Sequence, residues 1–255
     1  MSYTRVLLIS MLGCLSVTLA HAQYRDELIY GLQFGANYSY ADDITTTIIP
    51  EPYFTDYKAR NKWLPGINVG GFVNLRGTEA PAIAGHAEVS FSTQGGKMIF
   101  YNNQTDFNYE LKFISASITT DLLVKFYPGE NGQNNWKNFN IGTGVEINAV
   151  TSHDNIKYKS WNSLEAFGSD LEQQRQLRNV LKARTSYGIV VNIGYECSNT
   201  TSIFHIPFPV TFDFRYVLGL RDVLETYPNS YNFIDNYNNG HCFQFKLGYF
   251  FPRKS

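Results

Sequence analysis

The chain has 255 residues, of which 17% are charged and 16% are aromatic, and its formal net charge at pH 7 is -1. This length allows one large domain or two small ones. Because positive charge is not in excess, the composition gives no support for a nucleic-acid partner. After the N-terminus, the sequence contains no apolar run of about 18 residues that would form a transmembrane helix.

The N-terminus has the pattern of a secretory signal peptide. Arg5 precedes an apolar run from Val6 to Leu19, and Ala20-His21-Ala22 follows as a small-x-small cleavage site. We therefore predict a signal peptide over residues 1–22, which exports the chain, and a mature domain over residues 23–255. A membrane anchor is the alternative interpretation of the same segment.

Eight segments of the mature chain alternate between apolar and polar residues. They span residues 28–40, 67–75, 83–91, 114–126, 139–149, 187–195, 210–220 and 243–251. Every second position in them is uncharged and almost always Leu, Ile, Val, Phe, Tyr or Ala. Such alternation over about ten residues, with apolar side chains facing lipid, is typical of a transmembrane β-barrel. We predict an all-β, eight-stranded antiparallel up-and-down barrel. The alternatives are a soluble sandwich, in which the apolar face packs on a core, and a soluble lipocalin-like barrel.

The connections between these segments alternate in length. Residues 41–63, 92–113, 150–186 and 221–242 form the long ones, whereas 77–82, 128–138 and 196–209 are shorter. Outer-membrane barrels have short periplasmic turns and long extracellular loops, so we predict that both termini are periplasmic. In the third long connection, Ser169-Asp170-Leu171-Glu172 has the pattern of a capping box. It predicts a short helix to about Arg184, which either packs over the barrel mouth or binds a partner.

The inward-facing positions carry equal numbers of acids and bases. An eight-stranded barrel is just wide enough for side chains to fill it, and buried charges must be paired. We therefore predict a closed lumen filled by salt bridges. A small-solute pore is the alternative, although a pore would favour an excess of one charge. The acids are Glu88, Asp121, Glu146, Glu196 and Asp213, and the bases are Arg76, Lys125, Arg215, Arg221 and Lys246.

No residue pattern predicts a catalytic, cofactor-binding or metal site, so we expect a protein that is not an enzyme. His86, Glu88 and Ser90 share the inner face of one strand. Neighbours at this spacing are about 6.5–7 Å apart, whereas a nucleophile and its base need ~2.6–3.2 Å. A lipid-modifying enzyme is thus the less favoured alternative.

The cysteines and the remaining histidines give weak signals. His241 precedes Cys242, but this pair alone does not make a metal site. Cys197 ends the sixth segment and Cys242 begins the eighth, so they lie at opposite ends of the predicted barrel. Because a disulfide needs Cα atoms ~4.4–6.8 Å apart, we predict two unpaired thiols.

Six segments, in chain order, are similar to strands of one known family. They are Tyr30–Asn37, Ala87–Lys97, Leu122–Tyr127, Gly194–Glu196, Arg215–Asp222 and Leu247–Phe251. With them the chain resembles the PorT-like outer-membrane β-barrel proteins of Bacteroidota. The resemblance implies a bacterial outer-membrane location, contact with outer-membrane lipid and lipopolysaccharide, and insertion by the barrel-assembly machinery. It also implies a structural or interaction role, with a component of a protein-secretion apparatus as a candidate partner. It carries over no site residues.

Overall fold

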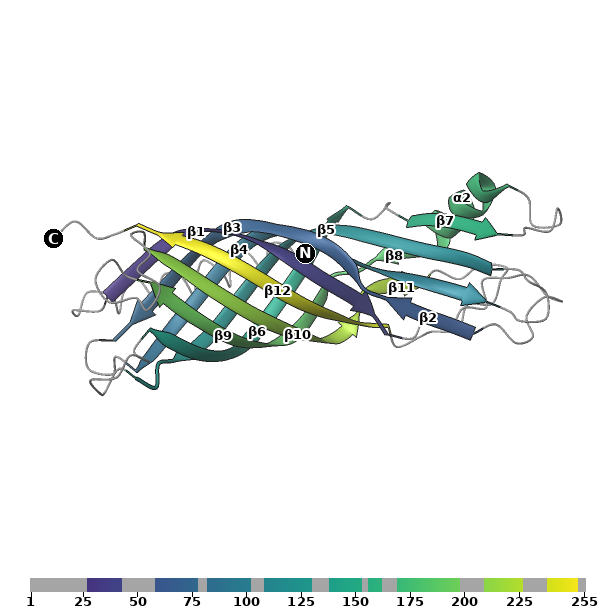
Figure 1. Ribbon diagram of the computed structural model, residues 1–255. Coiled ribbons are helices and arrows are strands. Elements are labelled where there is room, and N and C mark those ends of the chain that lie inside the picture. The colour runs from purple at the N-terminus through teal and green to yellow at the C-terminus, as the bar shows by residue number, and fades with distance from the viewer. Residues whose placement is uncertain are drawn as a thin grey trace.

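The computed structural model describes residues 27–42, 58–77, 82–101, 108–129, 138–152, 156–161, 169–197, 209–226 and 238–251. The predicted signal peptide lies outside these ranges. Eight long strands form a closed antiparallel ring, since each pairs with the next and the last pairs with the first. The predicted eight-stranded barrel is therefore confirmed (Figure 1). Its strands are β1 (Glu27–Ala41), β3 (Leu64–Arg76), β4 (Ile83–Tyr101), β5 (Asn108–Phe126), β6 (Phe139–Ser152), β9 (Ser186–Cys197), β10 (Val210–Asp222) and β12 (Asn239–Phe250).

The uncharged positions of the strands face outward, as the alternation predicts. Val145 in β6 and Ile189 in β9 are 47% and 41% exposed, whereas polar side chains such as Asn192 are buried inside. A barrel with an apolar outside and a polar inside is the inverse of a soluble lipocalin-like barrel. Within the described residues, no helix is both long and apolar enough to cross a membrane.

Two strands continue well beyond the barrel wall, where the sequence predicted a loop over residues 92–113. β4 and β5 stay paired without a register shift from Ile83↔Phe126 to Tyr101↔Asn108. Two short strands, β2 (Lys58–Lys62) and β7 (Ile156–Trp161), pair with their free edges. The result is a four-stranded extension in the order β2-β4-β5-β7, which we call the projecting sheet: residues 58–62, 97–101, 108–113 and 156–161 (Figure 1).

The loop prediction was wrong because the strand alternation continues past the membrane-length segment. The inner face of the projecting sheet carries Met98, Leu111 and Ile156, which are 0–2% exposed. These apolar side chains are buried in protein, so the strand pairing is supported beyond the lipid. Two further short strands, β8 (Leu181–Ala183) and β11 (Leu224–Thr226), pair with each other at this end of the barrel (Figure 1).

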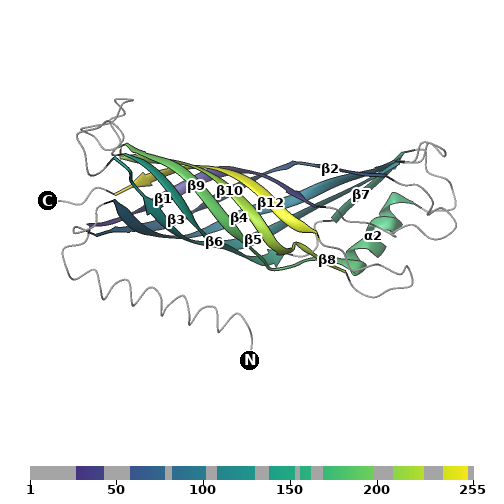
Figure 2. The same ribbon diagram turned by 90° about the horizontal axis from the view of Figure 1, so that it is seen from below.

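The predicted loop helix is present as α2 (Asp170–Val180). The Glu172 N–H donates to Ser169 Oγ at 3.3 Å, which is the capping contact expected from the sequence. The helix ends at Val180, earlier than predicted, because residues 181–183 form β8. Leu171, expected on an apolar stripe, is 59% exposed. The helix instead lies beside β7 (Figure 2). Arg178 joins the two elements, because its Nε donates to the Ile156 carbonyl at 3.3 Å.

Candidate functional site

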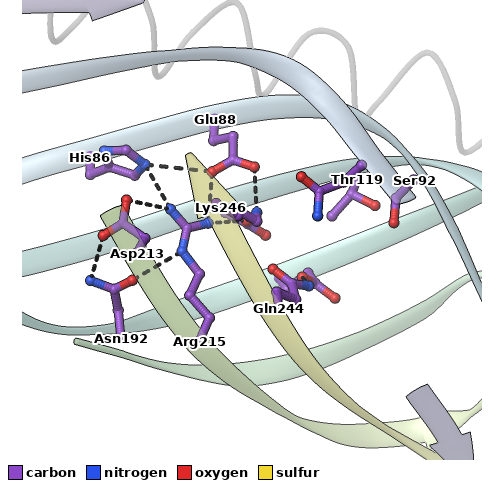
Figure 3. Close-up of polar contacts among 12 residues, drawn as sticks. His86, Glu88, Ser92, Thr119, Asn192, Asp213, Arg215, Gln244 and Lys246 are labelled. Atoms are coloured by element: carbon purple, nitrogen blue, oxygen red, sulfur yellow. Dashed lines mark hydrogen bonds and ion pairs between the residues drawn. The ribbon is translucent and has the colours of Figure 1, made fainter. Parts of the chain in front are cut away.

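Charged side chains meet inside the barrel and cross its lumen (Figure 3). Arg215 Nη1 lies 2.6 Å from carboxylate oxygens of both Glu88 and Asp121. Lys246 Nζ contacts the same two carboxylates at 2.5 and 2.9 Å. All four side chains are 0–1% exposed. Two cations therefore neutralise two carboxylates in a place that solvent does not reach.

Further contacts connect this cluster to neighbouring strands. Arg215 Nε donates to Asn192 Oδ1 at 3.1 Å, and Asn192 Nδ2 donates to Asp213 Oδ1 at 3.0 Å. Lys125 Nζ donates to the same Asp213 oxygen at 3.1 Å. Gly194 makes room for this carboxylate, because a Cβ there would lie 2.4 Å from Asp213 Oδ1. These contacts form one cluster that joins β4, β5, β9, β10 and β12. We call it the lumen cluster, and its members are Glu88, Asp121, Lys125, Asn192, Asp213, Arg215 and Lys246.

A smaller cluster lies at the end of the barrel opposite the projecting sheet. Arg76, at the end of β3, forms a 3.1 Å ion pair with Glu196 on β9. The Tyr127 hydroxyl donates to Glu196 Oε1 at 2.5 Å, and the Arg76 guanidinium carbon lies 3.8 Å from the Tyr127 ring centroid. The predicted pairing of inward charges thus extends to this rim.

Two of the ten predicted inward charges behave differently from expectation. Arg221 does not join the lumen cluster; it lies beyond the last regular pair of β10 with β12, where the register shifts between Leu218 and Asp222. Its guanidinium carbon lies 6.0 Å from the ring centroid of Tyr187, an outward-facing residue. Glu146 is fully buried, and its carboxylate accepts hydrogen bonds from amide groups, including Gln244 Nε2 at 2.6 Å. Within the described residues it forms no ion pair, so the expectation that every buried charge is paired with an opposite charge was wrong for Glu146.

The residues weighed for catalysis lie in the lumen but do not form a nucleophile–base pair. His86 Nε2 is 3.2 Å from Arg215 Nη2 and 3.6 Å from Glu88 Oε2. Ser90 Oγ is buried and has no hydrogen-bond partner among the described residues. His86 therefore contacts the lumen cluster and does not activate Ser90.

His241 and Cys242 point to opposite sides of β12, because side chains of adjacent residues on a strand alternate between its faces. His241 Nδ1 is 2.7 Å from the Tyr216 hydroxyl, and its Nε2 is 2.7 Å from Asp42 Oδ2. Cys242 is buried among apolar lumen residues. In the described part of the chain, no three His, Cys, Asp or Glu residues gather as metal ligands. Cys197 and Cys242 are both free, as predicted, and both are buried.

A group of aromatic side chains marks the outer surface just below the projecting sheet. Trp63 stacks on Tyr38 at 5.3 Å and on Phe243 at 5.1 Å between ring centroids. Tyr40 lies 4.3 Å from Trp63 and stacks on His241 at 4.9 Å. We call these residues the aromatic girdle. Rings with a polar edge collect where a barrel passes from lipid to water.

The outer face of the projecting sheet carries a row of four lysines. Across neighbouring strands, Lys62 lies opposite Lys97, Lys97 opposite Lys112, and Lys112 opposite Lys157. Partners in an antiparallel ladder share a face, and neighbouring strands are ~4.8 Å apart, so the row spans roughly 14 Å. Arg60 and Lys159 lie on the same face one step further out, at the level of Glu110.

Glu110 is the acid on this face, and it forms an ion pair with Lys97 at 2.6 Å. The remaining cations of this face form no ion pair with any residue that the structure describes; they are Arg60, Lys62, Lys112, Lys157 and Lys159. A shallow hollow of about 550 Å³ lies on the same face, lined by Arg60, Lys62, Ile99, Tyr101, Asn108 and Trp161. We call the row and this hollow the basic face. The net charge of -1 gives no indication of the basic face. The alternating pairs Arg60-x-Lys62 and Lys157-x-Lys159 do indicate it, because two basic residues two positions apart share one face of a strand.

Comparison with known proteins agrees with this architecture. The family model described as "Outer membrane protein beta-barrel domain" matches residues 21–225. The chain belongs to this family. In this outer-membrane barrel the outward apolar band therefore faces lipid.

Solved structures with similarity to the chain share little sequence with it. OprG from Pseudomonas aeruginosa is 11% identical, with 89% of this chain and 96% of that chain covered and a TM-score of 0.36. Ail of Yersinia pestis, in complex with the heparin analogue sucrose octasulfate, is 12% identical, with 88% and 99% covered and a TM-score of 0.32. Neisserial surface protein A is 11% identical, with 89% and 99% covered and a TM-score of 0.34. No curated protein matches the chain.

Proposed function

We propose that this outer-membrane barrel is a non-enzymatic protein with a closed lumen, and that it acts through its extracellular projecting sheet in a structural or interaction role. The lumen cluster is the observation that carries the proposal. Arg215 and Lys246 tie carboxylates of β4 and β5 to β10 and β12, so a solute would have to break buried ion pairs to pass.

The packing around the cluster also supports a closed lumen. Beside Glu146, Gly219 and Cys242 the lumen leaves a cavity of about 20 Å³, which is about the space that one water needs. Hydrated solutes are larger, so this space does not favour the alternative of a small-solute pore.

The arrangement of His86 and Ser90 favours a role without catalysis. A serine nucleophile needs a base within hydrogen-bond reach, whereas His86 is held by Arg215 and Ser90 has no partner among the described residues. A lipid-modifying enzyme is therefore not the function that this site supports. Lipid A mass spectra that change when the gene is deleted would contradict this part of the proposal.

Conductance in planar bilayers tests the closed lumen directly. We expect no steady channels from the purified full-length protein. Arg215→Ser combined with Lys246→Ser removes both central cations and serves as the comparison, with folding checked by heat-modifiable gel migration. Steady channels from the unmodified protein would overturn the closed lumen.

The resemblance to PorT-like proteins adds a component of a secretion apparatus to this proposal as a candidate partner. Crosslinking in native membranes followed by detergent pull-down tests it, with a cysteine introduced at Lys159 for photo-crosslinker attachment on the projecting sheet and at Val145 as the lipid-facing control. We expect protein adducts from position 159 and not from position 145. Equal or absent protein adducts at both would argue against a protein partner for the projecting sheet.

A further inference from the structure

We propose that the basic face binds the phosphate groups of lipopolysaccharide in the surrounding outer leaflet. This inference rests on the proposed function and deepens it, because it names a ligand class for the same projecting sheet. The ligand is a phosphorylated glycolipid, which is recognised by cations for its phosphates and by aromatic rings for its sugars.

The charge pattern is the first argument. Lys62, Lys97, Lys112 and Lys157 are consecutive partners across four strands. Like charges directly opposite in a ladder are destabilising, and Glu110 offsets them through one ion pair, with Lys97. A lysine ammonium is a compact charge that binds phosphate well. An array of phosphates would therefore remove repulsion that the described residues leave in place.

The position of the row is the second argument. The β4–β5 ladder has no register shift, so Lys97 lies on the same face as lipid-facing Phe91. They are six positions apart, or roughly 20 Å along the strand and ~15 Å along the membrane normal after strand tilt. Lys62 directly precedes Trp63 of the aromatic girdle. The row thus begins where the girdle ends, at the height of lipid headgroups.

The hollow above the row is the third argument. It combines the cations Arg60 and Lys62 with the rings of Tyr101 and Trp161. Lys159 Nζ lies 5.1 Å from the Trp161 ring centroid. Aromatic rings offer an apolar surface to the C–H face of a sugar, and a nearby cation offers a partner for a phosphate on that sugar. Because the hollow is further from the membrane than the lysine row, it fits the core sugars that extend outward from lipid A.

The test measures binding of fluorescent bis-phosphorylated lipid A to the full mature protein in zwitterionic micelles. The variant is Lys62→Gln with Lys157→Gln, since both side chains are exposed at the edges of the sheet. Arg175→Gln with Lys182→Gln is the matched control, because it removes two positive charges from the same end of the protein but not from the basic face. Lys62→Arg with Lys157→Arg keeps the charge. Folding of each variant is verified by heat-modifiable gel migration.

We expect the K62Q/K157Q variant to bind lipid A about fivefold more weakly for each lysine removed, because a basic residue near an anionic surface contributes about this factor. The control and the arginine variant should bind as the unmodified protein does. Dephosphorylated lipid A should bind weakly to all of them, and added salt should weaken binding of the phosphorylated form.

Two results would overturn the proposal. One is equal binding of lipid A by the K62Q/K157Q variant and the unmodified protein. The other is binding of inositol hexakisphosphate, a soluble polyanion without acyl chains, as tightly as lipid A, which would make the basic face a receptor for soluble polyanions. Neither result bears on conductance or on protein crosslinking, so the proposed function is judged separately.

Discussion

Lys97 and Lys112 lie directly opposite each other in the β4–β5 ladder, on the face that continues the lipid-facing band. The four-stranded extension thus places like charges in register where a sheet would gain from opposite ones. Lys62 and Lys157 prolong the same row on either side. Repulsion among these lysines lowers the stability of the projecting sheet, and an anion bound at the row would remove this repulsion.

Removing one central lysine should stabilise the protein in detergent free of lipopolysaccharide. We expect Lys112→Gln to raise the free energy of unfolding of the projecting sheet by about 0.2–1 kcal/mol, because it relieves repulsion from both neighbouring lysines. Lys159→Gln is the control, and it should lower the free energy of unfolding, because Lys159 lies opposite the acid Glu110 in the β5–β7 ladder. Limited proteolysis of the sheet under increasing urea measures both. A destabilising effect of Lys112→Gln would show that the row is not repulsive.

Removing a cation from the lumen cluster should lower the free energy of unfolding of the barrel. Arg215→Met leaves Glu88 and Asp121 with one buried cation between them, and removal of one partner of a buried pair costs about 3–5 kcal/mol. The measurement is the urea midpoint for loss of heat-modifiable gel migration. Arg175→Met, on the exposed surface of α2, should change the midpoint little. Similar midpoints for both variants would mean that the cluster does not hold the barrel together.

The lipid-facing band can be tested at mid-strand. Val145→Arg and Ile189→Arg should each cost about 2–4 kcal/mol, because an arginine there faces the bilayer midplane. Leu171→Arg is the control: Leu171 is also apolar and exposed, but it lies on α2 outside the barrel wall. Folding into vesicles, followed by gel migration, reports the outcome. Normal insertion of both strand variants would place the membrane elsewhere.

The two cysteines should resist modification in the folded barrel. Cys197 and Cys242 are 0% and 2% exposed, so a membrane-impermeant maleimide should label neither until urea unfolds the protein. Mass spectrometry before and after unfolding counts the labels, and non-reducing gels test for a disulfide. Labelling of Cys242 in the folded protein would indicate that the lumen admits solutes, contrary to the proposed closure.

Local patterns in the sequence were sufficient to predict the barrel. The two-residue alternation predicted all eight strands and the outward face of Val145 and Ile189, because side chains on a strand alternate regardless of its partners. The capping box predicted α2, since Ser169 and Glu172 contact each other within one turn. The inward charges predicted a paired interior, because burying an unpaired charge in a narrow lumen is costly; Glu146, which accepts hydrogen bonds from amide groups instead, is the exception.

The sequence by itself therefore determined the barrel, its lipid-facing surface and the polar filling of its lumen, since each depends on period and composition within a strand. Tertiary structure alone decided the rest. Arg221 lies near the ring of Tyr187 and not in the lumen cluster, at the point where the pairing of β10 with β12 shifts register. Lys62, Lys97, Lys112 and Lys157 come from four separate segments, and only the register of three ladders places them in one row. Register between distant strands is a non-local property, set by pairing and packing that no single segment contains.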